Sequence, residues 1–342
     1  MTAISAGKLR GMRRLADSGG WFSMLAVDQR PPIINRLKDL GGTADDAQIA
    51  AIKRTLLEEL GPAASAVLCD PIWAYPAGYL AVGREQGLIV TLEDHRFEET
   101  GQGRRTAAIS GWSVEKIKRM GGEGVKVLAY FRPDADPAIN RHQEAFVRQV
   151  GQDCRRFDLP FVLELLVYPF AGAAQDYVED PAKRPELVLD SVRRFADPAY
   201  GVDIFKLESP LPAATVPPPD APTAAAVQKL FDELGQEAGR PWVLLSAGAT
   251  AEAFERALTF ACRAGASGFL AGRAIWWQAF QHYPDRDAMR QELRAKALPY
   301  IQRLRDVTAE KGIPWHRHPS LVDGPDLEDA GIEFPRSYGA MV

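Results

Sequence analysis

The sequence is poor in cysteine and histidine, and those it has are scattered. Its three cysteines, Cys69, Cys154 and Cys262, stand far apart with no CxxC pair among them. An odd, dispersed set argues against both a disulfide framework and a thiolate metal site. The five histidines do not gather at the predicted strand ends, and we expect His316 and His318, in a polar tail, to be solvated rather than metal-bound. We therefore expect no metal ion.

Long charged runs and long apolar runs are also missing. The 342 residues carry 41 Lys and Arg against 45 Asp and Glu, a net charge of −4, so nothing suggests a nucleic-acid or membrane partner. No window approaches the ~18 apolar residues of a spanning helix, and residues 1–20 lack the apolar centre of a signal peptide. No GxGxxG or Walker A motif follows the first strand, and we expect no cofactor. We predict a soluble, cytoplasmic protein.

What the sequence does contain is a regular alternation of short apolar segments and helical patterns. The segment 43–60 is typical of the helices, with Thr43 as the expected cap and Gly61 and Pro62 as the stop. Near-continuous hydrophobic strands alternating with helices predict an α/β fold, a closed (β/α)8 TIM barrel. The eight predicted strands lie at 22–28, 65–70, 87–93, 124–131, 161–167, 203–208, 242–247 and 267–272.

The predicted barrel is a single domain over residues 1–311 with terminal helices, followed by a peripheral C-terminal tail over 312–342. Its last element is a long peripheral helix at 286–311. Two connections, 94–112 and 209–222, are longer than the rest, and both follow the carboxyl end of a predicted strand. Because barrels associate through their outer helices, a homo-oligomer is a further expectation.

Polar residues recur at the carboxyl ends of the predicted strands, where barrel enzymes carry their chemistry. Alternation along 203–208 also places Glu208 on the same inward face as Lys206. A lone buried lysine is costly, so Lys126 and Lys206 should be paired with carboxylates or be partly neutral. The residues at these ends are Asp28, Asp70, Glu93, Lys126, Glu164, Lys206, Ser246 and Arg273.

These residue types can support covalent chemistry on a carbonyl compound. A neutral lysine amine attacks a carbonyl carbon and forms a Schiff base. Asp28, Glu93 and Glu164 are then candidates for moving protons and for balancing the charge of the iminium. A purely structural ion-pair network is the alternative, but two lysines among several carboxylates at adjoining strand ends favour a functional site.

The last two strands end in small residues and an arginine. Ser246, Gly248 and Thr250 follow the seventh strand, and Gly272 and Arg273 follow the eighth. In barrels this is the usual place for a phosphate group, held by backbone N–H groups and a cation. The expected partner is therefore a small phosphorylated molecule.

Eight motifs resemble, in order, those of the class I tagatose 1,6-bisphosphate aldolases and the related sulfofructose-phosphate aldolases. The resemblance spans roughly residues 8–310 and is carried by MLAVDQR, LCDP, GWSVEKIK, GVKVLAYF, LELLVY, IFKLESP, LLSAG and AGRAIW. It implies that Lys206 is the Schiff-base lysine and Glu164 the acid/base glutamate, supported by Asp28 and Lys126. The residues implied for the phosphate of the dihydroxyacetone phosphate half are Ser246, Gly248, Gly272 and Arg273.

The chain departs from the family pattern beside the aldehyde half of the substrate. Pro31 and Pro32 stiffen the segment after the DQR motif, where Gln29 and Arg30 are the expected contacts. Glu93 is expected to bind substrate as well. The resemblance thus implies that this segment lies beside the aldehyde half of the substrate.

The predicted activity is that of a class I aldolase, a carbon–carbon lyase. We predict cleavage of a ketose bisphosphate, with tagatose 1,6-bisphosphate as first choice, to dihydroxyacetone phosphate and glyceraldehyde 3-phosphate. Lys126 either favours the neutral amine of Lys206 or binds the C4 oxygen. One alternative is an aldolase for sulfofructose 1-phosphate or another sugar phosphate. A second is a non-catalytic regulator that binds a sugar phosphate.

Overall fold

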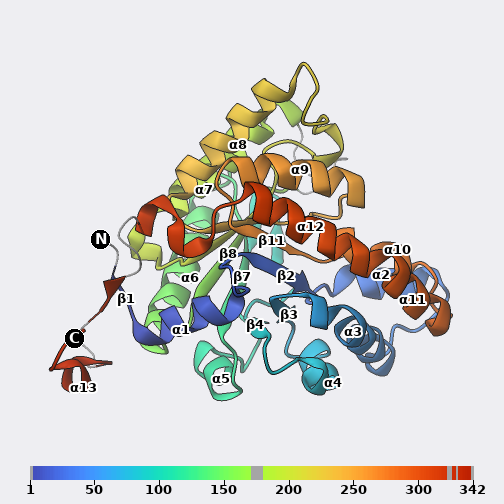
Figure 1. Cartoon of the computed structure of the whole chain (residues 1–342), viewed down its shortest axis with the longest axis horizontal. Helices are drawn as coiled ribbons and strands as arrows, with labels where there is room; N and C mark the ends of the chain where they lie inside the picture. The colour runs from blue at the N-terminus through green and yellow to red at the C-terminus, as the bar shows by residue number, and fades with distance from the viewer. Residues whose placement is uncertain (1–2, 171–179, 322–325, 329, 340–342) are drawn as a thin grey trace.

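Eight parallel strands close into a barrel in a computed structural model that describes residues 3–170, 180–321, 326–328 and 330–339 (Figure 1). Each predicted strand segment contains one of them, so the predicted (β/α)8 fold is confirmed. The order around the barrel is β10, β11, β2, β3, β4, β7, β8, β9. The strands are β2 (Phe22–Ala26), β3 (Ala66–Cys69), β4 (Gly87–Thr91), β7 (Gly124–Tyr130), β8 (Phe161–Leu166), β9 (Ile204–Leu207), β10 (Trp242–Leu244) and β11 (Gly268–Ala271).

Helices follow the strands and surround the barrel (Figure 1). Asp45, rather than the expected Thr43, caps α3, because its carboxylate accepts the Gln48 N–H while the Gln48 side chain accepts the Asp45 N–H. The helices are α1 (Ala6–Leu15), α2 (Pro31–Asp39), α3 (Asp46–Leu60), α4 (Ala74–Gly78), α5 (Val114–Arg119), α6 (Pro137–Arg156), α7 (Arg184–Phe195), α8 (Ala224–Ala238), α9 (Ala251–Arg263) and α10 (Arg273–Phe280).

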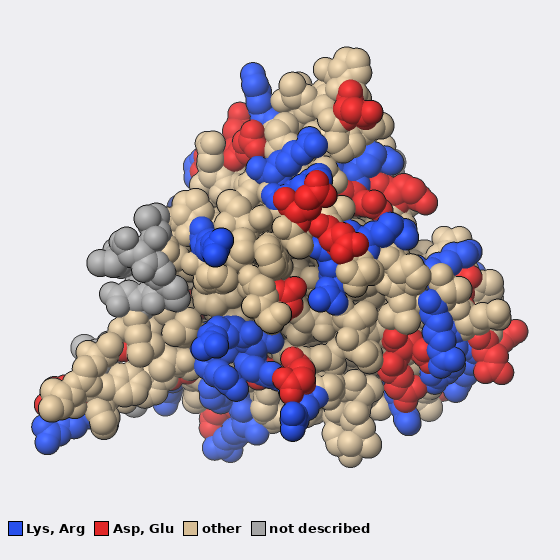
Figure 2. Space-filling view, in the orientation of Figure 1, with Lys and Arg blue, Asp and Glu red and all other residues tan. Residues whose placement is uncertain are grey.

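The predicted helix over 286–311 is present in three consecutive parts. These are α11 (Arg286–Glu292), a π-helical turn (Leu293–Ala297) and α12 (Leu298–Lys311). Within the described residues, no helix has the length and apolar character needed to cross a membrane. On the face drawn in Figure 2, acidic and basic side chains lie interspersed, and neither sign covers it alone.

The core has two parts because strand residues alternate between the two faces of the barrel wall. Phe205 and Leu207 of β9 point outward into the layer of helices. Ile204 points inward, where it packs with Met24 of β2 in a second apolar cluster. Lys206 has the same inward orientation as Ile204 and lies two residues nearer the carboxyl end of the strand.

Part of the segment 312–342 packs against the barrel. Trp315 is buried in the inner apolar cluster, and its backbone N–H donates to the Gly20 carbonyl. Strand β12 (Asp326–Leu327) pairs with β1 (Ala3–Ile4), and α13 (Phe334–Ser337) lies nearby at the edge of the molecule (Figure 1). His318 is buried rather than solvated as expected. Burial and the nearby charge of Arg240 lower the pKa of His318 to about 4.

The two long connections differ in structure. The segment 94–112 contains an antiparallel hairpin of β5 (Glu98–Thr100) and β6 (Gly103–Arg105), directly after β4. The segment 209–222 is irregular apart from one 3-10 turn at Ala213–Thr215. The hairpin therefore begins at the carboxyl end of the barrel, beside the predicted site.

Candidate active site

A cavity of about 300 Å³ opens at the carboxyl ends of the barrel strands. Ten of the residues that the sequence predicted for the site line this cavity. Gly248, which lies against Arg273, does not, and neither do Thr250 and Asp70. The fold therefore brings together residues from seven of the eight barrel strands or the turns that follow them. The predicted residues that line it are Asp28, Gln29, Arg30, Glu93, Lys126, Glu164, Lys206, Ser246, Gly272 and Arg273.

Lys206 and Glu164 are register partners on the neighbouring parallel strands β9 and β8. This pairing places Lys206 Nζ 2.9 Å from Glu164 Oε2, and both side chains are buried. Burial alone would raise the pKa of Glu164, but the charges of Lys126 and Lys206 outweigh it and lower that pKa. Glu164 is thus held as an anion beside the lysine amine.

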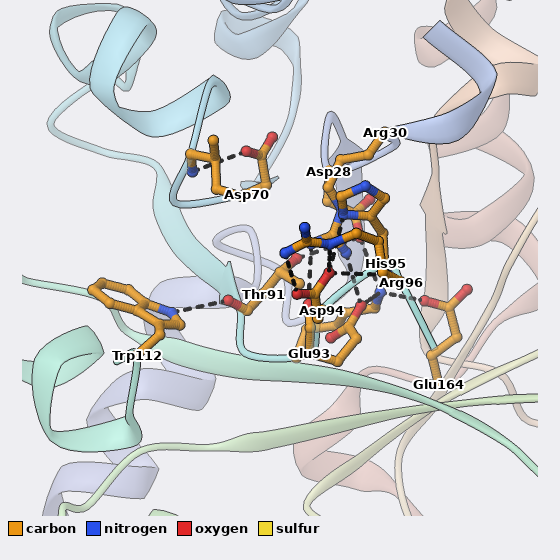
Figure 3. A network of polar contacts seen from close by, with 12 residues as sticks. Asp28, Arg30, Asp70, Thr91, Glu93, Asp94, His95, Arg96, Trp112 and Glu164 are labelled. Atoms are coloured by element: carbon orange, nitrogen blue, oxygen red, sulfur yellow. Dashed lines mark hydrogen bonds and ion pairs between the residues drawn. The ribbon is translucent and has the colours of Figure 1, made fainter. Parts of the chain in front are cut away.

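Lys126 contacts three carboxylates of a polar network, those of Asp28, Glu93 and Glu164, which are labelled in Figure 3. Its Nζ lies 2.9 Å from Asp28 Oδ2, 2.7 Å from Glu93 Oε1 and 2.9 Å from Glu164 Oε2. Burial would lower the pKa of Lys126, yet the three carboxylates raise it well above its usual range. Lys126 is the third residue of β7 rather than its end, so its side chain rises toward the cavity from within the barrel.

The other two carboxylates of this network have opposite pKa shifts. Burial tends to raise the pKa of both. Asp28 also faces Lys126, Lys206 and Arg30, whose charges hold its pKa well below the usual range. The pKa of Glu93 is raised, because burial outweighs the attraction of Lys126 and Arg30. Asp28 and Glu93 therefore differ in proton affinity, although both contact the ammonium group of Lys126.

The wall of the cavity that the sequence predicts to bind phosphate is formed by the turns after β10 and β11. Gly248 has φ +82°, and a Cβ atom there would lie 2.8 Å from an Arg273 guanidinium nitrogen. A Cβ on Gly272 would lie 2.6 Å from both the Ala26 carbonyl oxygen and Gln29 Nε2. Glycine at these positions lets the arginine and the backbone approach closely. Ser246 completes this wall of the cavity.

Several lining residues were not predicted. Tyr130 could have been found, because it shares the inward face of β7 with Lys126 and Leu128 at a spacing of two. Phe97 comes from the connection before the hairpin, and its ring lies 4.7 Å from the Tyr130 ring and 4.7 Å from the Arg104 guanidinium carbon. Sequence spacing carries no signal for such contacts between separate segments. The other unpredicted lining residues include Asp94, His95 and Thr106.

Two further expectations at the strand ends were wrong. Glu208 does not share the inward face with Lys206, because β9 ends at Leu207. Its carboxylate instead binds Arg184 of α7 and accepts the Val167 N–H at 2.7 Å. Asp70 lies outside the cavity lining, where it is buried against Lys53 of α3. Both residues therefore form ion pairs between the barrel and a surrounding helix, Glu208 with α7 and Asp70 with α3.

Pro31 and Pro32 line the cavity as the first residues of α2, where proline suits a helix start.

Among the described residues, His, Cys, Asp and Glu side chains do not gather in threes in a way that would hold a metal ion. The carboxylates of Asp28, Glu93 and Glu164 contact Lys126, Lys206 and Arg30.

The fold and this site define a class of enzyme. A closed (β/α)8 barrel carries a buried lysine against a carboxylate at its carboxyl end, with a second lysine held as a cation and an arginine across the cavity. This arrangement is that of the lysine-dependent aldolases, which cleave carbon–carbon bonds through an imine.

The chain belongs to the DeoC/LacD family of aldolases, whose family model matches residues 22–278. It is 33% identical to tagatose 1,6-diphosphate aldolase 2 of Enterococcus faecalis, over 95% of this chain and 100% of that protein. It is 32% identical to tagatose 1,6-diphosphate aldolase of Listeria monocytogenes, over 92% of this chain and 95% of the relative. The predicted family and enzyme class, a carbon–carbon lyase, are thereby confirmed.

Solved structures share the same fold at low sequence identity. Fructose-bisphosphate aldolase of Plasmodium falciparum, solved with TRAP and an inhibitor, matches with a TM-score of 0.68 at 13% identity, over 91% of this chain and 98% of that one. An archaeal fructose 1,6-bisphosphate aldolase with its catalytic Lys bound to a carbinolamine intermediate matches with a TM-score of 0.57 at 18% identity, over 87% and 98%. These matches extend the barrel assignment to nearly the whole chain.

Proposed function

We propose that this protein is a class I aldolase that cleaves tagatose 1,6-bisphosphate to dihydroxyacetone phosphate and glyceraldehyde 3-phosphate. The observation that carries the proposal is the contact of Lys206 Nζ with Glu164 Oε2 inside the cavity. The substrate is taken from the relatives, which are named as tagatose 1,6-diphosphate aldolases.

The reaction begins with imine formation. The phosphate on C1 binds on the side of Ser246 and Arg273, which brings the C2 ketone toward Lys206 on the neighbouring strand β9. The amine nitrogen of Lys206 attacks C2, and loss of water from the carbinolamine gives the iminium. Glu164, 2.9 Å from Nζ, is placed to exchange protons with the nitrogen and with the departing oxygen.

Bond cleavage uses the iminium as the electron sink. The C4 hydroxyl loses its proton to a carboxylate, the C3–C4 bond breaks, and its electron pair moves into the enamine. Protonation at C3 and hydrolysis of the imine then release dihydroxyacetone phosphate. Glu164 is the proposed proton-transfer group, and Asp28, held ionised by its neighbours, orients the substrate hydroxyls.

Lys126 acts by holding the carboxylates in place. An ammonium group has three N–H donors, and Lys126 contacts three carboxylates, Asp28, Glu93 and Glu164. This saturation favours an orienting and electrostatic role over direct binding of the C4 oxygen, which would require one carboxylate to give way.

Trapping of the imine tests the proposal. The protein is incubated with dihydroxyacetone phosphate, reduced with borohydride and digested, and the added mass is located by peptide mass spectrometry. We expect an adduct on Lys206 and none in the Lys206→Ala variant. Ligand binding without an adduct would contradict the proposed mechanism and favour a binding protein.

Turnover experiments then test the substrate. A panel of tagatose 1,6-bisphosphate, fructose 1,6-bisphosphate and sulfofructose 1-phosphate ranks the acceptors, and we expect the first to be cleaved with the highest kcat/KM. Cleavage should persist after dialysis against EDTA, because the iminium supplies the electron sink. Strong preference for the sulfonated ketose would replace the proposed substrate while leaving the imine chemistry intact.

We also place the reaction in the cytoplasm. All three cysteines are buried and unpaired, as suits a reducing compartment. Fractionation of the native cell, followed by an activity assay of each fraction, tests this placement.

A further inference from the structure

Glu93 has a buried carboxylate oxygen with no partner. Its side chain lines the cavity and is only 2% exposed. Oε1 accepts from Lys126 Nζ at 2.7 Å and faces an Arg30 guanidinium nitrogen at 3.4 Å. Oε2 is buried without a hydrogen-bond partner in the described part of the chain. Buried polar atoms in native proteins are paired in nearly every case. We therefore expect a hydrogen-bond donor of a bound ligand to pair with this oxygen.

The contacts on Oε1 fix the direction of the free oxygen. Arg30 also donates to the Glu93 carbonyl oxygen at 3.0 Å, so the same guanidinium binds both the backbone and the side chain of one residue. Lys126 and Arg30 are themselves buried. The carboxyl group is therefore held rigidly, and a substrate group that reaches it meets a preorganised acceptor.

Glu93 lies on the side of the barrel opposite the phosphate wall. The order of strands places β4, which Glu93 follows, directly across from β10, which Ser246 follows. From Lys206, polar contacts pass through Glu164 and Lys126 before they reach Glu93. If C2 of the ketose is bonded to Lys206 and its phosphate lies by Arg273, carbons beyond C4 extend toward Glu93.

We propose that Glu93 Oε2 accepts a hydrogen bond from the hydroxyl group on C5 of the ketose, and thereby restricts the enzyme to aldehydes that carry a hydroxyl beside the carbonyl carbon. This inference rests on the proposed function, which fixes the direction of the substrate. Glu93 is then a specificity-determining residue for 2-hydroxyaldehydes as a class.

The selectivity follows from the cost of leaving the oxygen unpaired. A deoxy aldehyde expels water from the cavity and supplies no donor to the carboxylate, so the buried acceptor stays unsatisfied. Sites that hydrogen-bond a substrate hydroxyl reject analogues without it far more strongly than apolar pockets reject a missing methylene group. The raised pKa of Glu93 agrees, because its burial is not fully offset by Lys126 and Arg30.

Two aldehydes that differ by one hydroxyl group test the inference in the condensation direction. Dihydroxyacetone phosphate is combined with glyceraldehyde 3-phosphate or with 3-phosphooxypropanal, and kcat/KM is measured for each. We expect the wild-type protein to favour the hydroxylated aldehyde by about 100-fold. In Glu93→Ala the ratio should fall below about tenfold, whereas Glu93→Gln, which keeps an acceptor oxygen, should retain most of it.

The ratio within one variant separates recognition from general damage. Loss of Glu93 also disturbs Lys126, but this lowers the rate with both aldehydes and leaves their ratio unchanged. Gln29→Ala is the matched control, because Gln29 Oε1 is likewise buried with no partner among the described residues. The sequence predicted that Gln29 contacts the aldehyde half, but in the structure it lies against Gly272, on the proposed phosphate side. We expect it to slow both aldehydes by the same factor.

The outcomes distinguish this inference from the proposed function. Borohydride trapping on Lys206 is carried out for every variant. A wild-type ratio near one, or an unchanged ratio in Glu93→Ala, with the adduct present, overturns the role of Glu93 alone. Absence of the adduct in the wild-type protein overturns the proposed function and this inference with it.

Discussion

A single oxygen of Glu164, Oε2, lies 2.9 Å from the amine of Lys206 and at the same distance from the ammonium of Lys126. The carboxylate therefore connects the proposed nucleophile to a fixed positive charge. Proton movement at Lys206 changes the charge balance on Glu164, and Lys126 keeps Glu164 ionised between steps. One shared atom couples the covalent chemistry to the network of carboxylates.

Replacing Glu164 by glutamine should separate substrate binding from proton transfer. The amide keeps the size of the side chain but cannot take or return a proton, so we expect kcat to fall about 10²- to 10⁴-fold with a small change in KM. Exchange of the C3 proton of dihydroxyacetone phosphate in D₂O, followed by NMR, should slow in parallel. Exchange at the wild-type rate would assign the proton transfer to another group.

The two lysines should differ in what their loss costs. Lys126→Met leaves three buried carboxylates without their shared cation, and removing one partner of a buried ion pair costs about 3–5 kcal/mol. Lys206→Met removes one partner from Glu164, which keeps Lys126, so the loss of stability should be smaller while activity disappears. Urea unfolding of both variants beside the wild type measures the difference, and equal losses would contradict the central role of Lys126.

Asp28 should contribute stability that depends on pH. Its pKa in the folded protein is lowered from 3.8, so the unfolded chain binds the proton more readily. The contribution is therefore fully present above pH 3.8 and is lost as the pH falls toward the folded pKa. We expect Asp28→Asn to be less stable than the wild type at pH 7, with the gap narrowing below pH 3.8. Urea unfolding as a function of pH tests this, and a gap that widens in acid would contradict it.

The stability contributed by Glu93 should depend on pH in the opposite direction to that of Asp28, and urea unfolding as a function of pH measures both. Its pKa is raised from 4.5, so its contribution is greatest below pH 4.5 and declines as the pH rises through the folded pKa. The gap between the wild type and Glu93→Gln should therefore change with pH in the direction opposite to that of Asp28→Asn.

The sequence was sufficient for the barrel and for most of the polar strand-end residues that line its mouth, because both depend on local order. A strand buried on both faces reads as an apolar segment, and the polar residue that ends it projects from the carboxyl edge. Lys206 and Glu164 were found in this way, each from its own strand. Their separation of 2.9 Å depends on strand register, which the sequence does not contain.

The residues that were missed or misplaced depend on contacts between distant segments. The inward orientation expected for Glu208 failed because the strand ends one residue earlier and Arg184 binds the carboxylate. Phe97 reaches the cavity because the connection after β4 returns against Tyr130. A pattern of spacing along the chain has no information on such pairings, and so the cavity residues that the connection after β4 contributes, such as Phe97, were missed.

The packing of Gly248 against Arg273 leads to a prediction with a close control. An alanine Cβ at Gly248 would meet the guanidinium at 2.8 Å and would adopt a φ of +82°, whereas at Gly111, with φ +71°, nothing in the described part of the chain lies within 4 Å. Both substitutions therefore carry the backbone cost of about 1 kcal/mol, and only Gly248→Ala displaces the arginine.

If Arg273 binds the C1 phosphate, Gly248→Ala should raise the KM for the bisphosphate about tenfold or more, because a charge-assisted contact is lost or lengthened. Gly111→Ala should leave KM unchanged, but it should lower the free energy of unfolding by the same backbone cost of about 1 kcal/mol that Gly248→Ala carries. Steady-state kinetics and urea unfolding of the two variants, measured side by side, separate strain from displacement of the arginine. An equal KM in both variants would show that the contact of Gly248 with Arg273 is not part of phosphate binding.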